Sequence, residues 1–143
     1  MKETIFVILM FLGGMNPMWS DGSFKEDLDF AQVVFVNATQ GKSGAWQFDV
    51  SVRHRDEGWS HYADAWQVEH PESGKIIAER VLLHPHETEQ PFTRSQEGVE
   101  VPAGLLQVRI RAKCNVHGFG GREVIVPLDS NNKTDLFEVR RAS

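Results

Sequence analysis

Apolar and polar side chains alternate strictly along two stretches of the chain, residues 46–53 and residues 106–114. Successive side chains of a strand point to opposite faces, so each stretch predicts a strand with one buried and one solvated face. No long stretch of the sequence has the spacing of an amphipathic helix. We therefore predict an all-β domain.

Turn-forming pieces divide the rest of the chain into further short runs of the same kind. Counting the two clear ones, about seven strands are expected, over residues 30–38, 46–53, 62–70, 76–83, 92–101, 106–114 and 123–128. Pro71 to Gly74 and Pro102 to Gly104 are typical turn sequences. This pattern predicts an immunoglobulin-like two-sheet sandwich over residues 28–128. A polar C-terminal tail, residues 129–143, should fray or form a short strand near Leu136 to Val139.

Two resemblances agree with this fold. The stretch VPAGLLQVRIRAKCNVHGFGGREVIV resembles the last two strands of fibronectin type III and related immunoglobulin-like domains, and Trp66 falls where such sandwiches often bury a tryptophan. The segments GWSHYADAWQV, HPHETEQPFTRS and VHGFGG resemble recurring segments of small uncharacterised exported bacterial proteins. The second resemblance implies export and a single domain, and it implies no particular chemistry.

The first twenty residues have the layout of a secretory signal peptide. Lys2 precedes an apolar run from Ile5 to Leu12, and glycines, a proline and Ser20 follow. The run is shorter than the roughly 20 residues that cross a bilayer. We therefore expect cleavage near residue 20, no stable membrane span afterwards, and a periplasmic or secreted protein.

Net charge and cysteine content limit the classes of partner and the roles of the cysteine. The net charge is −5, without the clustered basic face that a phosphate backbone requires, so nucleic acid is not an expected partner. Cys114 is the single cysteine, which excludes an internal disulfide. Three interpretations stay open for it: a small buried hydrophobe, a link to another chain, or a soft metal ligand.

Five of the six histidines are expected at one end of the sandwich. Because successive strands run up and down, the loops after the strands 46–53, 76–83 and 106–114 should lie at the same end. The histidines in those loops are His54, His61, His84, His86 and His117. His70 is expected at the opposite end, beside a proline turn.

This cluster predicts a copper or zinc site, because both ions bind imidazole nitrogens in sets of three or four ligands. His84, His86 and His117 would supply three ligands, with His61, His54, Asp64 or Cys114 as a fourth. Asp64 is placed on the inward face with Tyr62 and Trp66. Singly, each histidine could equally cap a turn or bond a carbonyl.

A second interpretation makes the same end a binding surface for an exported protein or a glycan. Trp59, Tyr62 and Phe119 lie in or beside the loops and suit such contacts, or alternatively plug the end of the sandwich. No nucleophile motif accompanies Cys114, so catalysis stays an open question with a non-enzymatic role favoured.

Overall fold

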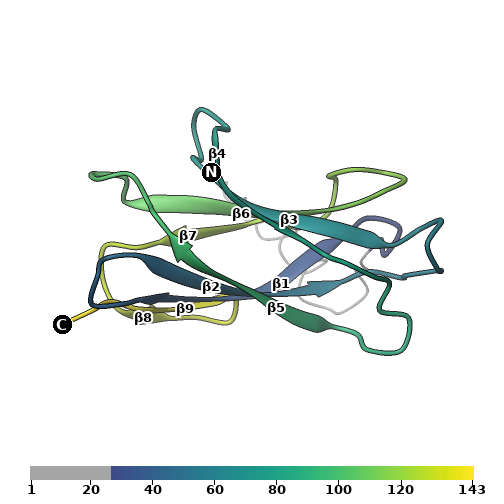
Figure 1. Ribbon diagram of the computed structural model, residues 1–143, viewed down its shortest axis with the longest axis horizontal. Coiled ribbons are helices and arrows are strands. Elements are labelled where there is room, and N and C mark those ends of the chain that lie inside the picture. The colour runs from purple at the N-terminus through teal and green to yellow at the C-terminus, as the bar shows by residue number, and fades with distance from the viewer. Residues whose placement is uncertain (1–26) are drawn as a thin grey trace, which may run out of the picture.

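The computed structural model describes residues 27–143, and the predicted signal peptide over residues 1–20 lies outside these described residues (Figure 1). The described part contains nine strands. They are β1 (Gln32–Gln40), β2 (Trp46–Arg53), β3 (Ala63–Glu69), β4 (Ile76–Val81), β5 (Phe92–Val99), β6 (Gln107–Cys114), β7 (Val124–Pro127), β8 (Asn132–Lys133) and β9 (Phe137–Arg140). Residues 27–143 hold no helix long and apolar enough to cross a membrane.

The strands form two sheets that pack face to face. One sheet has the order β5-β2-β1-β9-β8, and the other has the order β4-β3-β6-β7. All neighbouring pairs are antiparallel except β1 and β9, which run parallel. The predicted all-β, immunoglobulin-like sandwich is therefore confirmed, with nine strands in place of about seven.

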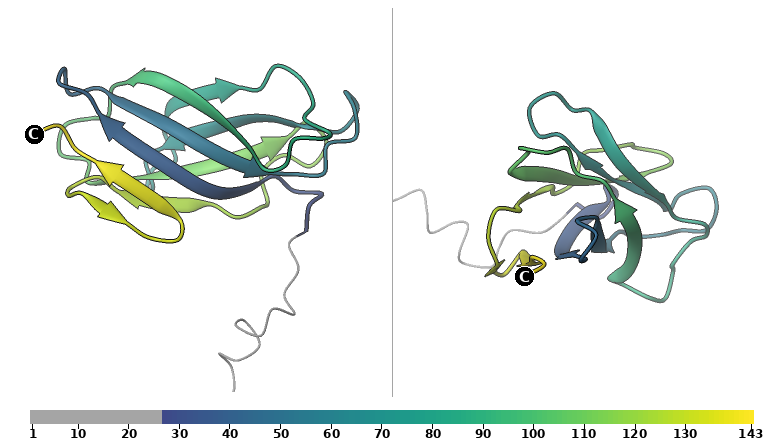
Figure 2. Two further views of the ribbon diagram at one scale, coloured as in Figure 1. Left: turned by 90° about the horizontal axis from the view of Figure 1, so that it is seen from below. Right: turned by 60° about the vertical axis from the view of Figure 1, so that its left-hand side comes forward.

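The two additional strands lie in the predicted polar tail, and β9 coincides with the short strand expected near Leu136 to Val139. β8 and β9 form a hairpin that joins the first sheet beside β1 (Figure 2). Val139 is buried, and Phe137 packs against the core. The sandwich thus continues beyond Leu128. Two apolar side chains in an otherwise polar segment anchor β9 on the core.

Alternation along the strands produces the core. In β2 every second side chain is buried, beginning with Trp46, and in β6 the same holds from Val108 to Cys114. Trp66 is completely buried, as the sequence predicts. Burying an aliphatic or aromatic side chain of this size contributes about 1.5–3 kcal/mol. The strands that carry the loops are therefore fixed in position.

The strand registers place the loops at two poles. Arg53 at the end of β2 pairs with Gln32 at the start of β1, and Cys114 at the end of β6 pairs with Ala63 at the start of β3. Loops 54–62, 82–91 and 115–123, with segment 27–31, therefore share one end, which we call the histidine pole. It forms the right-hand end of the molecule in Figure 1, and the C-terminus lies at the left. His70 lies at the opposite pole, as predicted.

One predicted side-chain direction is wrong. The pairing of β3 with β6 shifts register between Ala63 and Ala65, so an irregularity at Asp64 breaks the alternation. The Asp64 carboxylate accepts a 2.8 Å hydrogen bond from Nζ of Lys113 and is partly exposed. Asp64 is therefore held in an ion pair and does not join the inward-facing side chains.

Candidate metal centre

Two overlapping groups of side chains at the histidine pole bring potential ligand atoms together. The inner group consists of His54, His61 and Cys114, and the outer group consists of Asp29, His61 and His117. Within each group, one ligand atom of every residue lies within 4.8 Å of the others. His61 belongs to both groups, so the five residues form one continuous cluster.

The ends of two central strands position the inner group. His54 follows directly after β2 and Cys114 is the last residue of β6, and each is 1% exposed. Both continue the inward face of their strand, as alternation predicts. His61 lies in the loop before β3, with its ring edge-on to that of His54 at a centroid distance of 4.7 Å. The inner group thus closes the end of the core.

Asp56 fixes the orientation of His54. Its Oδ1 accepts a 2.5 Å hydrogen bond from Nδ1 of His54 and a 3.0 Å hydrogen bond from the backbone N–H of Ala63. Its Oδ2 accepts a 2.6 Å hydrogen bond from the backbone N–H of His86. Burial alone would raise the pKa of Asp56, but the hydrogen bonds from His54, His86 and Ala63 outweigh it, and the pKa is lowered. The carboxylate is therefore ionised, and Nε2 of His54 is left to face the cluster.

His61 repeats this arrangement. Its Nδ1 lies 2.7 Å from Oε1 of Glu57, and two backbone hydrogen bonds close the loop between these residues: Glu57 N–H to the His61 carbonyl at 2.7 Å and His61 N–H to the Gly58 carbonyl at 3.2 Å. Gly58 has a positive φ of 81°, which this tight loop requires. Nε2 of His61 is buried and has no hydrogen-bond partner. A buried polar nitrogen of this kind costs free energy unless something binds it.

The thiol of Cys114 faces the same space. Its Sγ accepts a 3.1 Å hydrogen bond from the backbone N–H of His117 and lies 3.5 Å from the carbonyl oxygen of Asp29. That carbonyl oxygen is also 3.3 Å from Nε2 of His54. Cys114 is free and buried. The thiol, the imidazole of His54 and the Asp29 carbonyl therefore meet at one point.

The outer group is closer to solvent. The Asp29 carboxylate pairs with Arg55 at 2.6 Å, and this hydrogen bond lowers the pKa of Asp29. The His117 ring is exposed and lies against the rings of Phe30 and His61, at centroid distances of 5.4 and 5.1 Å. The outer group thus lies between the inner group and the surface.

His84 and His86 do not converge with His117, although all three lie at the histidine pole. Neither belongs to a potential ligand group among residues 27–143. Nη2 of Arg94 lies 2.8 Å from Nε2 of His86, whose ring stacks on Phe92 at 3.9 Å. The pKa of His86 is lowered, because burial and the neighbouring Arg94 both oppose a positive charge on the ring. Arg94 therefore occupies Nε2 of His86, and Nδ1 of the same ring is buried without a hydrogen-bond partner.

The exposed His84 has a different neighbour. Its Nδ1 lies 3.0 Å from the carbonyl oxygen of Pro85, and its ring lies 4.5 Å from that of His86. Of the predicted ligands, the structure brings His54, His61 and Cys114 together, whereas His84 and His86 form no ligand group with His117 among residues 27–143. Loop 82–91 is held to Asp56 through the backbone N–H of His86.

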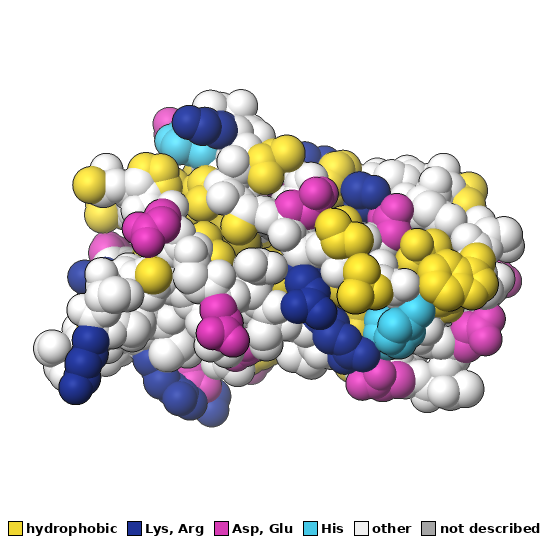
Figure 3. All heavy atoms as spheres, viewed as in Figure 1, with side chains coloured by type: hydrophobic (Ala, Val, Ile, Leu, Met, Phe, Trp, Pro, Cys, Tyr) yellow, Lys and Arg dark blue, Asp and Glu magenta, His cyan; other side chains and the backbone are white. Residues whose placement is uncertain are grey.

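The three predicted contact aromatics are placed differently from one another. Trp59 is 65% exposed and meets the ring of Tyr62 edge-on at 5.5 Å. Phe119 lies under the Arg111 guanidinium, which is 3.8 Å from the ring centroid. Figure 3 shows hydrophobic side chains at the surface of the histidine pole, next to a histidine. Trp59 is therefore available at the surface, whereas Tyr62 and Phe119 are both half-buried.

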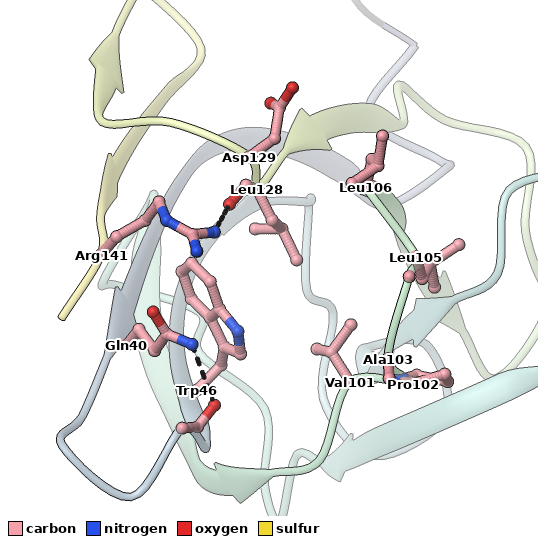
Figure 4. Close-up of a pocket in the computed structure, with 12 residues that line it drawn as sticks. Gln40, Trp46, Val101, Pro102, Ala103, Leu105, Leu106, Leu128, Asp129 and Arg141 are labelled. Atoms are coloured by element: carbon pink, nitrogen blue, oxygen red, sulfur yellow. Dashed lines mark hydrogen bonds between the residues drawn. The ribbon is translucent and has the colours of Figure 1, made fainter.

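A hollow of about 300 Å³ lies at the opposite pole (Figure 4). Trp46 and Leu128 line it, and its one guanidinium, that of Arg141, donates to the Leu128 carbonyl. The Gln40 side chain donates to the Gly44 carbonyl. The guanidinium and the amide that line this hollow are thus bound to the protein itself.

Sequence reasoning missed four residues that shape the cluster: Asp29, Asp56, Glu57 and Arg94. Two of them carry a signal that can be read from the sequence. Asp56 follows His54 by two residues, and Glu57 precedes His61 by four, spacings at which a loop can bring a carboxylate onto Nδ1. Asp29 and Arg94 come from distant parts of the chain, so only the fold places them.

The chain has a relative among known proteins. No protein-family model and no solved structure matches the chain. The chain is 38% identical over 120 residues to a protein of Halomicrobium mukohataei described as "Putative lipoprotein". The match covers 82% of this chain and 58% of that protein, so the chain spans little more than half the length of its relative. This chain is thus similar to part of a longer protein that is described as a lipoprotein.

Proposed function

We propose that this protein is an exported binding module that holds one copper or zinc ion in the inner group at the histidine pole. The proposal rests on an arrangement that occurs twice at this pole. Two histidines, His54 and His61, each present Nδ1 to a carboxylate, and beside them lies the buried thiol of Cys114.

Carboxylates that hold the far nitrogen of an imidazole are typical of metal-binding histidines, because they fix the ring and its tautomer and make the ligating nitrogen more basic. Imidazole and thiolate together suit zinc and copper. The outer group offers His117 or the Asp29 carboxylate as a further ligand. The unpartnered Nε2 of His61 would gain its missing partner from the ion.

Export is supported by the relative that is described as a lipoprotein and by the predicted signal peptide. We therefore propose a periplasmic or secreted location. A thiol ligand in such a compartment would be shielded from oxidation here, because Cys114 is 1% exposed.

A second function is favoured by one specific observation, the 65% exposure of Trp59. Large aromatic side chains at the surface often serve as anchors for partners. In this alternative, Trp59 and Tyr62 bind an exported protein or a glycan without an ion. The two functions differ in whether the purified protein takes up metal.

The test measures metal content. The purified protein without a histidine tag is dialysed against copper or zinc and then against buffer, and its metal is measured by elemental analysis. We expect about one ion per chain. His61→Ala should reduce uptake sharply, because it removes the shared ligand at the rim without touching the deep core.

His84→Ala is the matched control, since it removes an exposed histidine at the same pole that belongs to neither group. Circular dichroism verifies that each variant is folded. Uptake that is equal in His61→Ala and in the unaltered protein would overturn the proposal, and so would the absence of stoichiometric uptake.

A further inference from the structure

We infer that the ion of this site is copper and that the inner group holds it as a redox-active copper–thiolate centre, which accepts and returns one electron. The inference rests on the proposed metal site and concerns which ion it serves and what that ion does. It follows from the set of donor atoms, from what surrounds the sulfur, and from the surface next to the site.

The donor set combines one thiol, two imidazoles and one backbone carbonyl. Three ligands about 2.0–2.3 Å from one ion in a plane lie about 3.5–4.0 Å apart, so the inner group, with atoms within 4.8 Å, needs only a small closure. The Asp29 carbonyl oxygen lies 3.5 Å from Sγ of Cys114 and 3.3 Å from Nε2 of His54. Two imidazoles and a thiolate with a weak axial oxygen are the ligand set of electron-transfer copper sites.

Zinc fits this arrangement less well than copper. Zinc sites are usually tetrahedral, with four strong ligands or three and a water. The Asp56 and Glu57 carboxylates are bound to the Nδ1 atoms of His54 and His61. Of the outer-group donors, the Asp29 carboxylate is held by Arg55 at 2.6 Å, and His117 shares a ligand group with His61 but not with His54 and Cys114 among residues 27–143. The remaining donor at the inner group is the neutral Asp29 carbonyl, which is a weak ligand and completes a trigonal copper site.

The sulfur of Cys114 has the surroundings that tune a copper centre. The backbone N–H of His117 donates to Sγ at 3.1 Å, and the side chain is almost completely buried. Hydrogen bonds and apolar surroundings at the thiolate set the redox potential of such sites. His54 and Cys114 are fixed by β2 and β6, so the same ligand geometry serves both oxidation states of copper.

The surface beside the site suits brief contact with a redox protein. The His117 ring reaches solvent while its backbone N–H binds the sulfur. In the same loop Val116 is 55% exposed, and Trp59, whose carbonyl accepts a 3.1 Å hydrogen bond from Asn115, is 65% exposed. Transient redox complexes use small interfaces. One electron from a one-electron donor protein reduces Cu(II) to Cu(I), and a one-electron acceptor protein reoxidises it. The thiol proton leaves to solvent when copper binds.

The experiment adds one equivalent of Cu(II) to the purified protein with its thiol reduced and oxygen excluded. We expect an intense visible absorption from charge transfer between thiolate and copper, together with the paramagnetic resonance signal of Cu(II). Ascorbate should bleach both, and ferricyanide should restore both. Cys114→Ser should lose the colour, and His84→Ala should keep it.

The outcomes separate this inference from the proposed function. If the protein takes up zinc or copper stoichiometrically but Cu(II) gives no intense band, or if Cu(II) consumes the thiol by linking two chains, the copper–thiolate inference fails and the metal site stands. If neither ion is taken up, the proposed function fails as well. Colour that persists in Cys114→Ser would also overturn the inference, because the thiolate would then not be the ligand.

Discussion

The carboxylate of Asp56 lies 2.5 Å from Nδ1 of His54, and neither side chain reaches solvent. The same carboxylate also accepts backbone hydrogen bonds from Ala63, the first residue of β3, and from His86 in loop 82–91. One buried side chain of loop 54–62 therefore holds loop 82–91 and the start of β3, and it orients His54 of the candidate metal centre.

Asp56→Asn should destabilise the fold. The amide cannot accept all three hydrogen bonds, so at least one buried donor loses its partner, and we expect a loss of about 3 kcal/mol in the free energy of unfolding. Urea unfolding measures it. The affinity for metal should fall about 10- to 100-fold. Asp29→Asn, which breaks an ion pair at the surface, is the control and should cost much less stability. Equal losses in the two variants would contradict the structural role of Asp56.

Stability should decrease as pH falls from 7 to 5 in the presence of a chelator. The pKa of His86 is lowered from its ordinary value of 6.5, so the unfolded chain binds a proton that the folded chain refuses. The contribution of His86 is complete above its ordinary pKa and declines as pH falls through it toward the lowered value. His86→Gln should flatten this slope in urea unfolding, and an unchanged slope would exclude His86 as its source.

Asp56 adds a second loss of stability at more acid pH. Its pKa is lowered from 3.8, so its contribution is present above that value and disappears as pH falls through the lowered one.

Bound metal should raise the melting temperature. A ligand present at about 100 times its Kd stabilises the folded state by about 2.7 kcal/mol, which for a domain of this size corresponds to roughly 10 °C. Thermal unfolding with the ion, and again after chelation, measures the difference. His61→Ala should abolish most of it, and His84→Ala should leave it intact. If the ion raises the melting temperature of His61→Ala as much as that of His84→Ala, the ion binds at another site.

Gly121→Ala should disturb the candidate metal centre through the backbone. A Cβ at this position would lie 2.0 Å from the carbonyl oxygen of Ala31, and the segment before β1 would have to move. We expect a loss of about 1–3 kcal/mol and weaker metal binding, because that segment carries the Asp29 carbonyl. Gly41→Ala, whose Cβ would meet nothing closer than 3.8 Å, is the matched control. Urea unfolding and metal titration measure the two effects, and wild-type values for Gly121→Ala would contradict the close approach.

Alternation along strands was sufficient to predict the sandwich and the pole that carries five histidines, because side-chain parity and strand direction are local properties. The same parity correctly placed His54 and Cys114 at the inner rim. It failed at Asp64, where an irregularity in the pairing of β3 with β6 reverses the direction of the side chain. A hydrophobic pattern does not encode such an irregularity.

The candidate ligand set depends on contacts that the alternation of side chains along a strand cannot give. His84 and His86 lie two residues apart in sequence and look like a ligand pair, yet Arg94, from β5, occupies Nε2 of His86. Asp29 lies in the segment before β1, which is distant in sequence from Cys114, yet its carbonyl oxygen reaches the cluster. Which loop residues meet is decided by hydrogen bonds between loops, and those follow from the whole fold.

The parallel pairing of β9 with β1 has a consequence for how this protein behaves at high concentration. Without the C-terminal hairpin, the sheet would end in the nine-residue β1, whose backbone groups could template edge-to-edge association with another molecule. With the hairpin in place, the sheet ends in β8, which consists of the exposed residues Asn132 and Lys133. A two-residue edge strand that carries a lysine leaves few backbone groups for a second chain to pair with. The hairpin therefore protects this edge of the sheet against aggregation.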